Sequence, residues 1–408
     1  MLTGKTLENF SKLILKYGVN LQKNQGLEIA CPVEKQEIAR AITRSAYQMG
    51  AKMVRVRWQD ENIDLLSYQF ADFDTLKEVP KWFVDSKNYL VENDYCYIAI
   101  SAEDPDIFKD IPDQKTSAVA VAKSKALKKF SDVVMANGIR WCVVSVPTES
   151  WAKKVFPNAE NPVEKLSDAI EKTMRLDCAD PEKEWQEHIE KLDKRAKYLN
   201  DMNFEYLHFK NSLGTDLKIG LADDHVWTSA QEVAKDGVKF VANMPTEEVF
   251  TAPHRLKAEG RLVSALPLVE NGKVIENFTL DFKRGKVVGF SAEKGYETLK
   301  NLLNTDNGTL RLGEVALIGK NSPIAKSGIL FFNTLFDENA SCHLAIGKAY
   351  PTTIKNGNDL TLSQLKQKGL NDSTEHVDFM IGTPDLVVTG IGKDGTQTTI
   401  FSDGEWVI

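Results

Sequence analysis

Two hydrophobic periods alternate in the first half of the chain. Short apolar runs alternate with segments whose apolar side chains recur every three or four residues, which predicts strands alternating with helices. The predicted helices are residues 5–17, 34–49 and 117–137, and the predicted strands are residues 26–33, 51–58, 94–101 and 139–147. Repeated strand–helix–strand units favour a mostly parallel sheet with right-handed connections, so we expect an α/β domain here.

Helical patterns at residues 162–176 and 182–202 end this alternation. In the second pattern, apolar residues recur at helical spacing from Trp185 onward, with Glu and Lys between them. A long charged helix is suited to connect two domains. We therefore expect an N-terminal α/β domain at residues 1–182 and a second domain at residues 183–408.

Short strands and tight turns dominate the second half. Residues 204–221 predict a hairpin, and the pairs Asn271, Gly272 and Arg284, Gly285 are typical of turns between strands. Further strands are predicted at residues 261–269, 274–282, 286–290 and 309–319, and a helix at residues 296–304. This pattern indicates an antiparallel sheet, so the predicted fold class is α/β in the first domain and α+β in the second.

The composition fits a globular protein and excludes several kinds of partner. The 408 residues are 42% hydrophobic and 27% charged, with a net charge of −7. This length agrees with two domains, and the negative charge gives no electrostatic basis for binding nucleic acid or an anionic membrane. The motifs G-x-G-x-x-G and G-x-x-x-x-G-K-[ST] are absent, so we expect the first half to support or shape a site rather than bind a nucleotide.

The spacing of the cysteines and the first ten residues indicate the cellular compartment in which the protein is expected. The five cysteines are scattered without a C-x-x-C pair, which favours a reducing compartment over a disulfide framework. The first ten residues include Lys5 and Glu8 and lack the apolar core of a signal peptide. No stretch reaches the ~18 apolar residues of a membrane span. We therefore expect a cytoplasmic protein.

Possible metal ligands concentrate between residues 313 and 378. Two of the six histidines lie there, each close to carboxylates in the sequence. Imidazoles combined with several carboxylates suit Zn²⁺, Co²⁺ or Mn²⁺. The candidate ligands are Glu314, Glu338, His343, His376 and Asp378.

The spacing of these residues supports a site, although each has a simpler interpretation. In a strand, His376 and Asp378 face the same side, as two ligands of one site must. A buried carboxylate at Glu314 needs a partner or a metal, but this residue also fits the outer face of a half-exposed strand. A lone histidine such as His343, at the start of an apolar strand, is usually a hydrogen-bonded core residue.

Glu247 and Glu248 form an acidic pair between Pro245 and Pro253. Adjacent side chains point in different directions, so we expect one metal ligand and one free carboxylate near it. The alternative is a solvated acidic pair, which is the common fate of adjacent glutamates.

Four motifs resemble those of the thermophilic-type metalloaminopeptidases, the family of aminopeptidases S and T and of PepS. They are Asn-Met-Pro-Thr-Glu-Glu-Val-Phe-Thr-Ala-Pro, Gly-Glu-Val-Ala-Leu, Phe-Asp-Glu-Asn-Ala-Ser-Cys-His and His-Val-Asp-Phe-Met-Ile-Gly. The resemblance implies a two-domain, usually dimeric exopeptidase with a dinuclear metal site in its C-terminal domain. It implies the ligand set Glu248, Glu314, Glu338, His343, His376 and Asp378, with Tyr350 near the metals.

The implied reaction removes the N-terminal residue from peptides with a free N-terminus, by a water that two divalent ions activate. Zinc, cobalt, manganese and magnesium all suit such a site. We expect Glu314 to bridge the ions, Glu247 to act as general base and Tyr350 to stabilise the oxyanion. The alternatives are a surface or supporting carboxylate for Glu247 and a core aromatic for Tyr350.

Two other functions fit the same residues. A two-metal amidohydrolase or phosphoesterase uses similar ligands. A non-catalytic metal- or peptide-binding protein would use its α/β half to recognise a partner.

Overall fold

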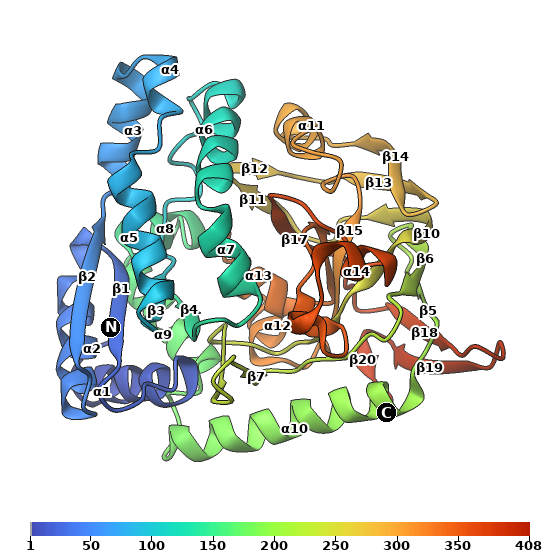
Figure 1. The fold of residues 1–408 in the computed structure, drawn as a ribbon, viewed down its shortest axis with the longest axis horizontal. Coiled ribbons are helices and arrows are strands. Elements are labelled where there is room, and N and C mark those ends of the chain that lie inside the picture. The colour runs from blue at the N-terminus through green and yellow to red at the C-terminus, as the bar shows by residue number, and fades with distance from the viewer. Residues whose placement is uncertain (1) are drawn as a thin grey trace. The chain divides into compact units, whose positions relative to one another are not determined.

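The computed structural model describes residues 2–408, which form two compact units by their internal packing (Figure 1). The first unit contains residues 2–190 together with Ala230–Thr246 and Phe331–Leu335. The second contains Lys191–Ser229, Glu247–Leu330 and Phe336–Ile408. The domain boundary near residue 182 stays a prediction.

A four-stranded parallel sheet in the order β2-β1-β3-β4 is the base of the first unit. Its strands are β1 (Gly26–Pro32), β2 (Met53–Gln59), β3 (Cys96–Ile100) and β4 (Trp141–Val144). The central strand β1 is buried from Gly26 to Cys31, as its continuous apolar run predicts for a strand covered on both faces. The four predicted strands and their parallel arrangement are confirmed.

Helices connect and flank these strands. They are α1 (Gly4–Leu13), η1 (Ile14–Gly18), η2 (Val33–Lys35), α2 (Gln36–Gln48), α3 (Glu61–Phe70), α4 (Phe73–Leu76), α5 (Lys81–Glu92), α6 (Asp113–Ala126), α7 (Lys128–Met135), α8 (Glu149–Val155) and α9 (Pro162–Thr173). Helix α10 (Pro181–Met202) begins in the first unit and continues into the second, which starts at Lys191. The single helix predicted at residues 117–137 is wrong, because the backbone leaves the helical region at Leu127 (φ −94°, ψ 7°) and separates α6 from α7. Helix α3 was not predicted, although Ile63, Leu66 and Phe70 recur at helical spacing; all three side chains are exposed in the structure.

Residues Ala230–Thr246 pack with the first unit although they follow the first strands of the second. They contain the short pair β7 (Glu232–Val233) and β8 (Lys239–Phe240). The backbone N–H of Val143 donates to Ala242 O at 2.8 Å, and that of Met244 donates to Val143 O at 3.0 Å. This segment therefore continues the parallel sheet beyond β4 and ends directly before the Glu247, Glu248 pair.

Glu61, at the start of α3, gives the first unit a pH-dependent stability. Burial raises the pKa of Glu61 from 4.5 to about 7, and neighbouring acidic residues act in the same direction, although the Asp104 N–H donates to its Oε2 at 2.8 Å. The folded state binds this proton more tightly than the unfolded chain does. Stability should therefore fall as the pH rises from 4.5 to about 7.

Replacing Glu61 by Gln is expected to remove the fall in stability between pH 4.5 and about 7. The variant should be more stable than the parent by about 1–2 kcal/mol at pH 8 and equally stable at pH 4.5, after allowing for the half-exposed position of the side chain. Thermal unfolding midpoints at the two pH values are the measurement. Glu149→Gln is the matched control, because Glu149 is an exposed carboxylate paired with Lys153. An equal gain for Glu61→Gln at both pH values would contradict the prediction.

The second unit contains an eight-stranded antiparallel sheet in the order β14-β13-β10-β6-β5-β18-β19-β20. Its strands are β5 (Tyr206–Lys210), β6 (Asp216–Leu221), β10 (Pro253–Val263), β13 (Thr279–Lys283), β14 (Lys286–Ser291), β18 (Val387–Ile391), β19 (Gln397–Ser402) and β20 (Glu405–Trp406). The hairpin predicted at residues 204–221 is confirmed as β5 and β6. The Arg284, Gly285 turn is also confirmed, and both residues have positive φ (49° and 73°), as a tight turn between β13 and β14 requires.

Two strands predicted in this unit are each interrupted. The strand predicted at residues 261–269 is wrong, because β10 ends at Val263 and β11 (Leu268–Glu270) starts after Pro267, which has no N–H to donate. The strand predicted at residues 274–282 is divided into β12 (Lys273–Ile275) and β13. Asn277 lies between these two strands and has a positive φ of 49°.

A smaller antiparallel sheet in the order β17-β16-β15-β9 carries the candidate ligands. Its strands are β9 (Val249–Thr251), β15 (Leu312–Leu317), β16 (His343–Gly347) and β17 (His376–Met380). The helical segments along this part of the chain are α11 (Tyr296–Leu303), α12 (Pro323–Ser327), α13 (Thr334–Asp337), η3 (Glu338–Ala340), η4 (Pro351–Thr353), η5 (Gly357–Asp359) and α14 (Leu362–Gln367). The fold therefore combines one parallel sheet with antiparallel sheets. No helix among residues 2–408 has both the length and the apolar character needed to cross a membrane.

Candidate metal centre

The strand register places four candidate ligands on one face of the smaller sheet. Ala345 in the middle strand β16 lies opposite Glu314 of β15 on one side and opposite Asp378 of β17 on the other. Directly paired residues point to the same face, and so do residues two positions apart in one strand. His343 is two positions before Ala345, and His376 is two positions before Asp378, so all four candidate ligands share this face.

A bulge turns Glu314 toward the other ligands. Leu312 pairs with Ile346 and Glu314 pairs with Ala345, so Gly313 is the extra residue in β15. Strict alternation would have placed Leu312 and Glu314 on the same face, but the bulge sends them to opposite faces. A side chain at Gly313 would lie 2.5 Å from Lys348 O, which explains why this position has none.

Small residues leave room between the ligands. Ala345 and Gly347 alternate with Leu344 and Ile346 along β16, so the ligand face of this strand is small and the opposite face is large. Gly347 has a φ of 101°, and a Cβ there would lie 2.1 Å from Glu375 O. On its ligand face, β16 therefore carries His343 followed by the small residues Ala345 and Gly347. This leaves space in which side chains from both neighbouring strands can approach each other.

Two further carboxylates come from outside these strands. Glu248 directly precedes β9, and two positions later Phe250 pairs with Ala316, which itself pairs with His343. This register directs Glu248 to the ligand face. Glu338 lies in the turn η3, five positions before His343, and only 7% of it is exposed.

The side chains form two groups of ligand atoms that share one residue. Glu248, Glu314 and His343 form the first group, and Glu314, His376 and Asp378 form the second; within each group the ligand atoms lie within 4.8 Å of one another. Glu314 Oε1 lies 3.4 Å from His343 Nε2, and its Oε2 lies 3.7 Å from His376 Nε2. The two oxygens of one carboxylate therefore face two different imidazoles.

Hydrogen bonds to the backbone set the orientation of both imidazoles. Nδ1 of His343 donates to Glu338 O at 2.9 Å, and Nδ1 of His376 donates to Lys348 O at 2.6 Å. A carbonyl oxygen only accepts, so Nδ1 carries the proton in each ring, and in a neutral ring Nε2 presents its lone pair. Such outer contacts are typical of histidines that bind metals.

These lone pairs face other acceptors. His343 Nε2 lies 3.2 Å from Glu248 Oε2, and His376 Nε2 lies 3.4 Å from Asp378 Oδ1. Asp378 Oδ1 is buried and makes no hydrogen bond. Acceptor atoms at these separations repel each other unless a cation or a proton lies between them, so the donor set fits divalent metal ions.

The electrostatics of the site show an excess of buried negative charge. Burial raises the pKa of the Glu314 carboxyl to about 7. It also raises the pKa of Glu338 well above its ordinary value, and neighbouring carboxylates such as Asp378 add to this effect. Burial opposes a charged His376, but the charge and hydrogen bond of Asp378, the charge of Glu314 and the Lys348 carbonyl together outweigh it and raise the pKa of His376 to about 9. Bound cations would remove this imbalance and keep the carboxylates ionised.

Glu247 lies beside the ligands and is held by an amide that the sequence analysis missed. The Glu247 N–H donates to Asn339 Oδ1 at 2.8 Å, and Asn339 Nδ2 lies 3.4 Å from Glu338 Oε1. Asn339 is fully buried, and Glu247 is 7% exposed, so the solvated acidic pair weighed above is not what the structure shows. The only signal for Asn339 in the sequence is its place between Glu338 and His343.

Tyr350 packs against the site with its ring. Its ring meets His376 edge-on at 5.0 Å between centroids and meets Phe250 in the same manner at 5.9 Å. The structure thus brings Tyr350 and the six candidate ligands to one region of the second unit. Glu338 belongs to neither group of three, but its pKa responds to the charges of Asp378, Glu248 and Glu314.

Known proteins match this chain over nearly its whole length. A family model described as thermophilic metalloprotease (M29) matches residues 3–406. Aminopeptidase 2 of Geobacillus stearothermophilus is 42% identical over 404 residues, 98% of each chain, and aminopeptidase PepS of Streptococcus thermophilus is 41% identical over 407 residues, 99% of this chain and 98% of the other. The solved structure of wild-type AmpT from Thermus thermophilus matches with a TM-score of 0.90 at 35% identity, over 99% of both chains. The chain therefore belongs to the thermophilic metalloprotease family M29.

Proposed function

We propose that this protein is a metal-dependent aminopeptidase that hydrolyses the N-terminal residue from peptides at a dinuclear centre in its second unit. The observation that carries the proposal is the sharing of Glu314 between two groups of ligand atoms. Membership of a family whose relatives are named aminopeptidases supports the substrate class. Nothing comparable favours the phosphoesterase or the non-catalytic alternative.

Six residues would hold the two ions. Glu248 and His343 would bind one ion, His376 and Asp378 would bind the other, and Glu314 would bridge them through its two oxygens. Glu338 would complete the set from the turn before His343. When bound, such ions lower the pKa of a water and polarise the scissile carbonyl, and zinc, cobalt, manganese and magnesium all suit this set of oxygen and imidazole ligands.

Glu247 is the proposed general base. Its side chain is largely buried and its backbone is fixed by Asn339, which also contacts the Glu338 carboxylate. A base must lie within one hydrogen bond, or one water, of the proton it accepts. Its burial, its fixed backbone and its position directly before the proposed ligand Glu248 support this role. It would take the proton of the attacking water and return it to the leaving amine.

Tyr350 is the proposed stabiliser of the oxyanion. The contact of its ring with His376 brings the phenol close to the second group of ligands. Tyr350→Phe removes only the hydroxyl, so kcat should fall by about 10²-fold while the KM for the substrate changes little. An unchanged kcat would assign this residue to packing against Phe250 instead.

The cytoplasm is the proposed location. All five cysteines are unpaired, and Cys31, Cys96, Cys142 and Cys342 are buried, which agrees with a reducing compartment. A homodimer stays a prediction that the family resemblance alone supports.

Hydrolysis of aminoacyl-p-nitroanilides tests the proposed function. We expect turnover that is lost after EDTA treatment and returns with Co²⁺ or Zn²⁺, because the carboxylates and imidazoles of the centre need a cation. N-acetylated aminoacyl-p-nitroanilides should not be cleaved, since an aminopeptidase requires the free amino group. Turnover of p-nitrophenyl phosphate in place of the anilide would favour the phosphoesterase. No metal-dependent turnover of either substrate would favour the non-catalytic alternative.

A further inference from the structure

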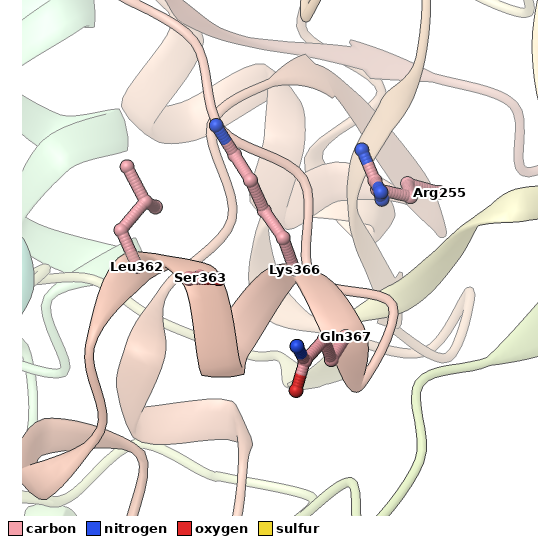
Figure 2. A pocket seen from close by; sticks show the side chains of 5 residues that line it. All are labelled: Arg255, Leu362, Ser363, Lys366 and Gln367. Carbon is pink, nitrogen blue, oxygen red and sulfur yellow. The ribbon is translucent and has the colours of Figure 1, made fainter.

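A cavity of about 410 Å³, open to solvent, lies in the second unit at helix α14 and strand β10 (Figure 2). Its lining residues are Arg255, Leu362, Ser363, Lys366 and Gln367. None of them is a proposed metal ligand. The volume falls within the ~300–1,000 Å³ range of small-molecule sites. The cavity is therefore a candidate binding site with a lining of its own.

The lining is rich in hydrogen-bond donors. Figure 2 shows Lys366 extending from α14 between Leu362 and Arg255. Arg255 offers a planar fork of N–H groups, and Lys366 offers an ammonium. Ser363 and Gln367 add a hydroxyl and an amide. Leu362 is 46% exposed and gives the cavity one apolar wall.

The guanidinium of Arg255 lacks part of its expected hydrogen bonding. Its Nε is buried and has no hydrogen-bond partner. Because Nε itself is buried, a ligand in the cavity would bind the terminal Nη groups of Arg255 rather than Nε.

The charges around the cavity are mostly positive. Arg311 Nη1 donates to Arg255 O at 2.7 Å; burial lowers the pKa of Arg311, and the charge of Arg255 adds to this effect. Lys366 Nζ donates to Asp372 at 3.0 Å, which uses one of its three donors. Two cations, Arg255 and Lys366, therefore line the cavity, and none of its five lining residues is acidic, so the charge of the lining favours an anionic ligand.

We propose that this cavity binds the carboxylate or phosphate group of a small organic molecule, with Arg255 as its bidentate partner and Lys366 as a second cation. Arginine binds both groups through two parallel hydrogen bonds, and an ammonium strengthens the site as a point charge. The cavity is larger than a single oxyanion, and Leu362 would pack against the organic part of the ligand. This site is independent of the proposed peptidase reaction.

Isothermal titration calorimetry of the metal-loaded protein tests the proposal with two probes. Inorganic phosphate represents one source of the oxyanion, and N-acetyl-leucine offers a carboxylate with an apolar side chain and a blocked amine. Sodium chloride at matched ionic strength is the control for screening. Binding of one or both probes that is weakened in Arg255→Gln and retained in Glu314→Gln supports the proposal and identifies the preferred oxyanion. No binding of either probe at millimolar concentrations overturns it.

Single-residue variants test whether the probe binds in this cavity. Arg255→Gln and Lys366→Gln should each weaken the bound probe by about tenfold or more, the loss typical of a hydrogen bond to a charged group. Lys368→Gln removes the same charge from the end of α14, but Lys368 pairs with Asp224 and does not line the cavity, so the affinity should be unchanged. Equal weakening in all three variants would indicate long-range attraction and overturn the proposal.

A metal-site variant separates this cavity from the metal centre. Glu314→Gln should bind the probe as the parent does. Loss of binding in Glu314→Gln, with full binding in Arg255→Gln, would place the anion at the metal centre and overturn the proposal. If Arg255→Gln does not fold, as shown by circular dichroism, Lys366→Gln alone decides.

Discussion

Glu314→Gln is expected to bind neither divalent ion and to lose aminopeptidase turnover. Each oxygen of this carboxylate faces a different imidazole, and Glu314 is the residue that the two groups of ligand atoms share. Bound metal contributes several kcal/mol to such reactions, which corresponds to a loss on the order of 10³-fold or more in kcat. The measurements are metal content by elemental analysis of the purified protein and kcat on an aminoacyl-p-nitroanilide.

Two controls make this result specific to the shared carboxylate. Glu248→Gln removes a ligand of one group only, so it should retain the ion of the group that contains His376. Glu276→Gln, on the surface and paired with Lys294 at 2.8 Å, should retain both ions and full turnover. Two ions bound per chain in Glu314→Gln would refute the bridging role.

Glu247→Gln is expected to keep its metal content and to lower kcat by at least ~10²-fold, the usual contribution of a general base. The amide has nearly the same size as the carboxylate, and the Glu247 N–H still donates to Asn339, so the ligand Glu248 keeps its place. The measurements are kcat across pH and metal content.

The same two measurements show what would remove Glu247 from the mechanism. Near-normal turnover in Glu247→Gln would mean that another group accepts the proton. A loss of metal in parallel with kcat would instead make Glu247 part of the ligand set. Only a low kcat with full metal content supports the role of base.

Most of the architecture could be predicted from the sequence, because apolar residues recur at different spacings in the two halves of the chain. Apolar runs predict the buried strands β1, β3 and β4 of the parallel sheet, and β2 appears where Val alternates with Arg on a partly exposed strand. Local breaks are harder to foresee. The backbone at Leu127 divides one expected helix, and Pro267 interrupts one expected strand, since hydrophobic period says little about where a backbone changes direction.

The candidate site was predictable in its residue types and less so in its geometry. The two-residue spacing of His376 and Asp378 is enough to place them on one face of β17. The direction of Glu314 depends on the bulge at Gly313, which alternation does not reveal. Asn339 was missed, because a single amide among loop residues gives no sign that it is fully buried between two acidic segments.

The residue at the position of Ala345 can be compared among other chains with this fold. It lies in the strand between Glu314 and Asp378, and the space above its methyl group is where these two side chains approach each other. A relative could keep every proposed ligand and still lose the shared centre if a bulky residue replaced this alanine. In an alignment, the residue at this position would therefore separate chains that can assemble the pair of sites from chains that only carry the ligands. A position without any chemistry of its own then becomes diagnostic of activity.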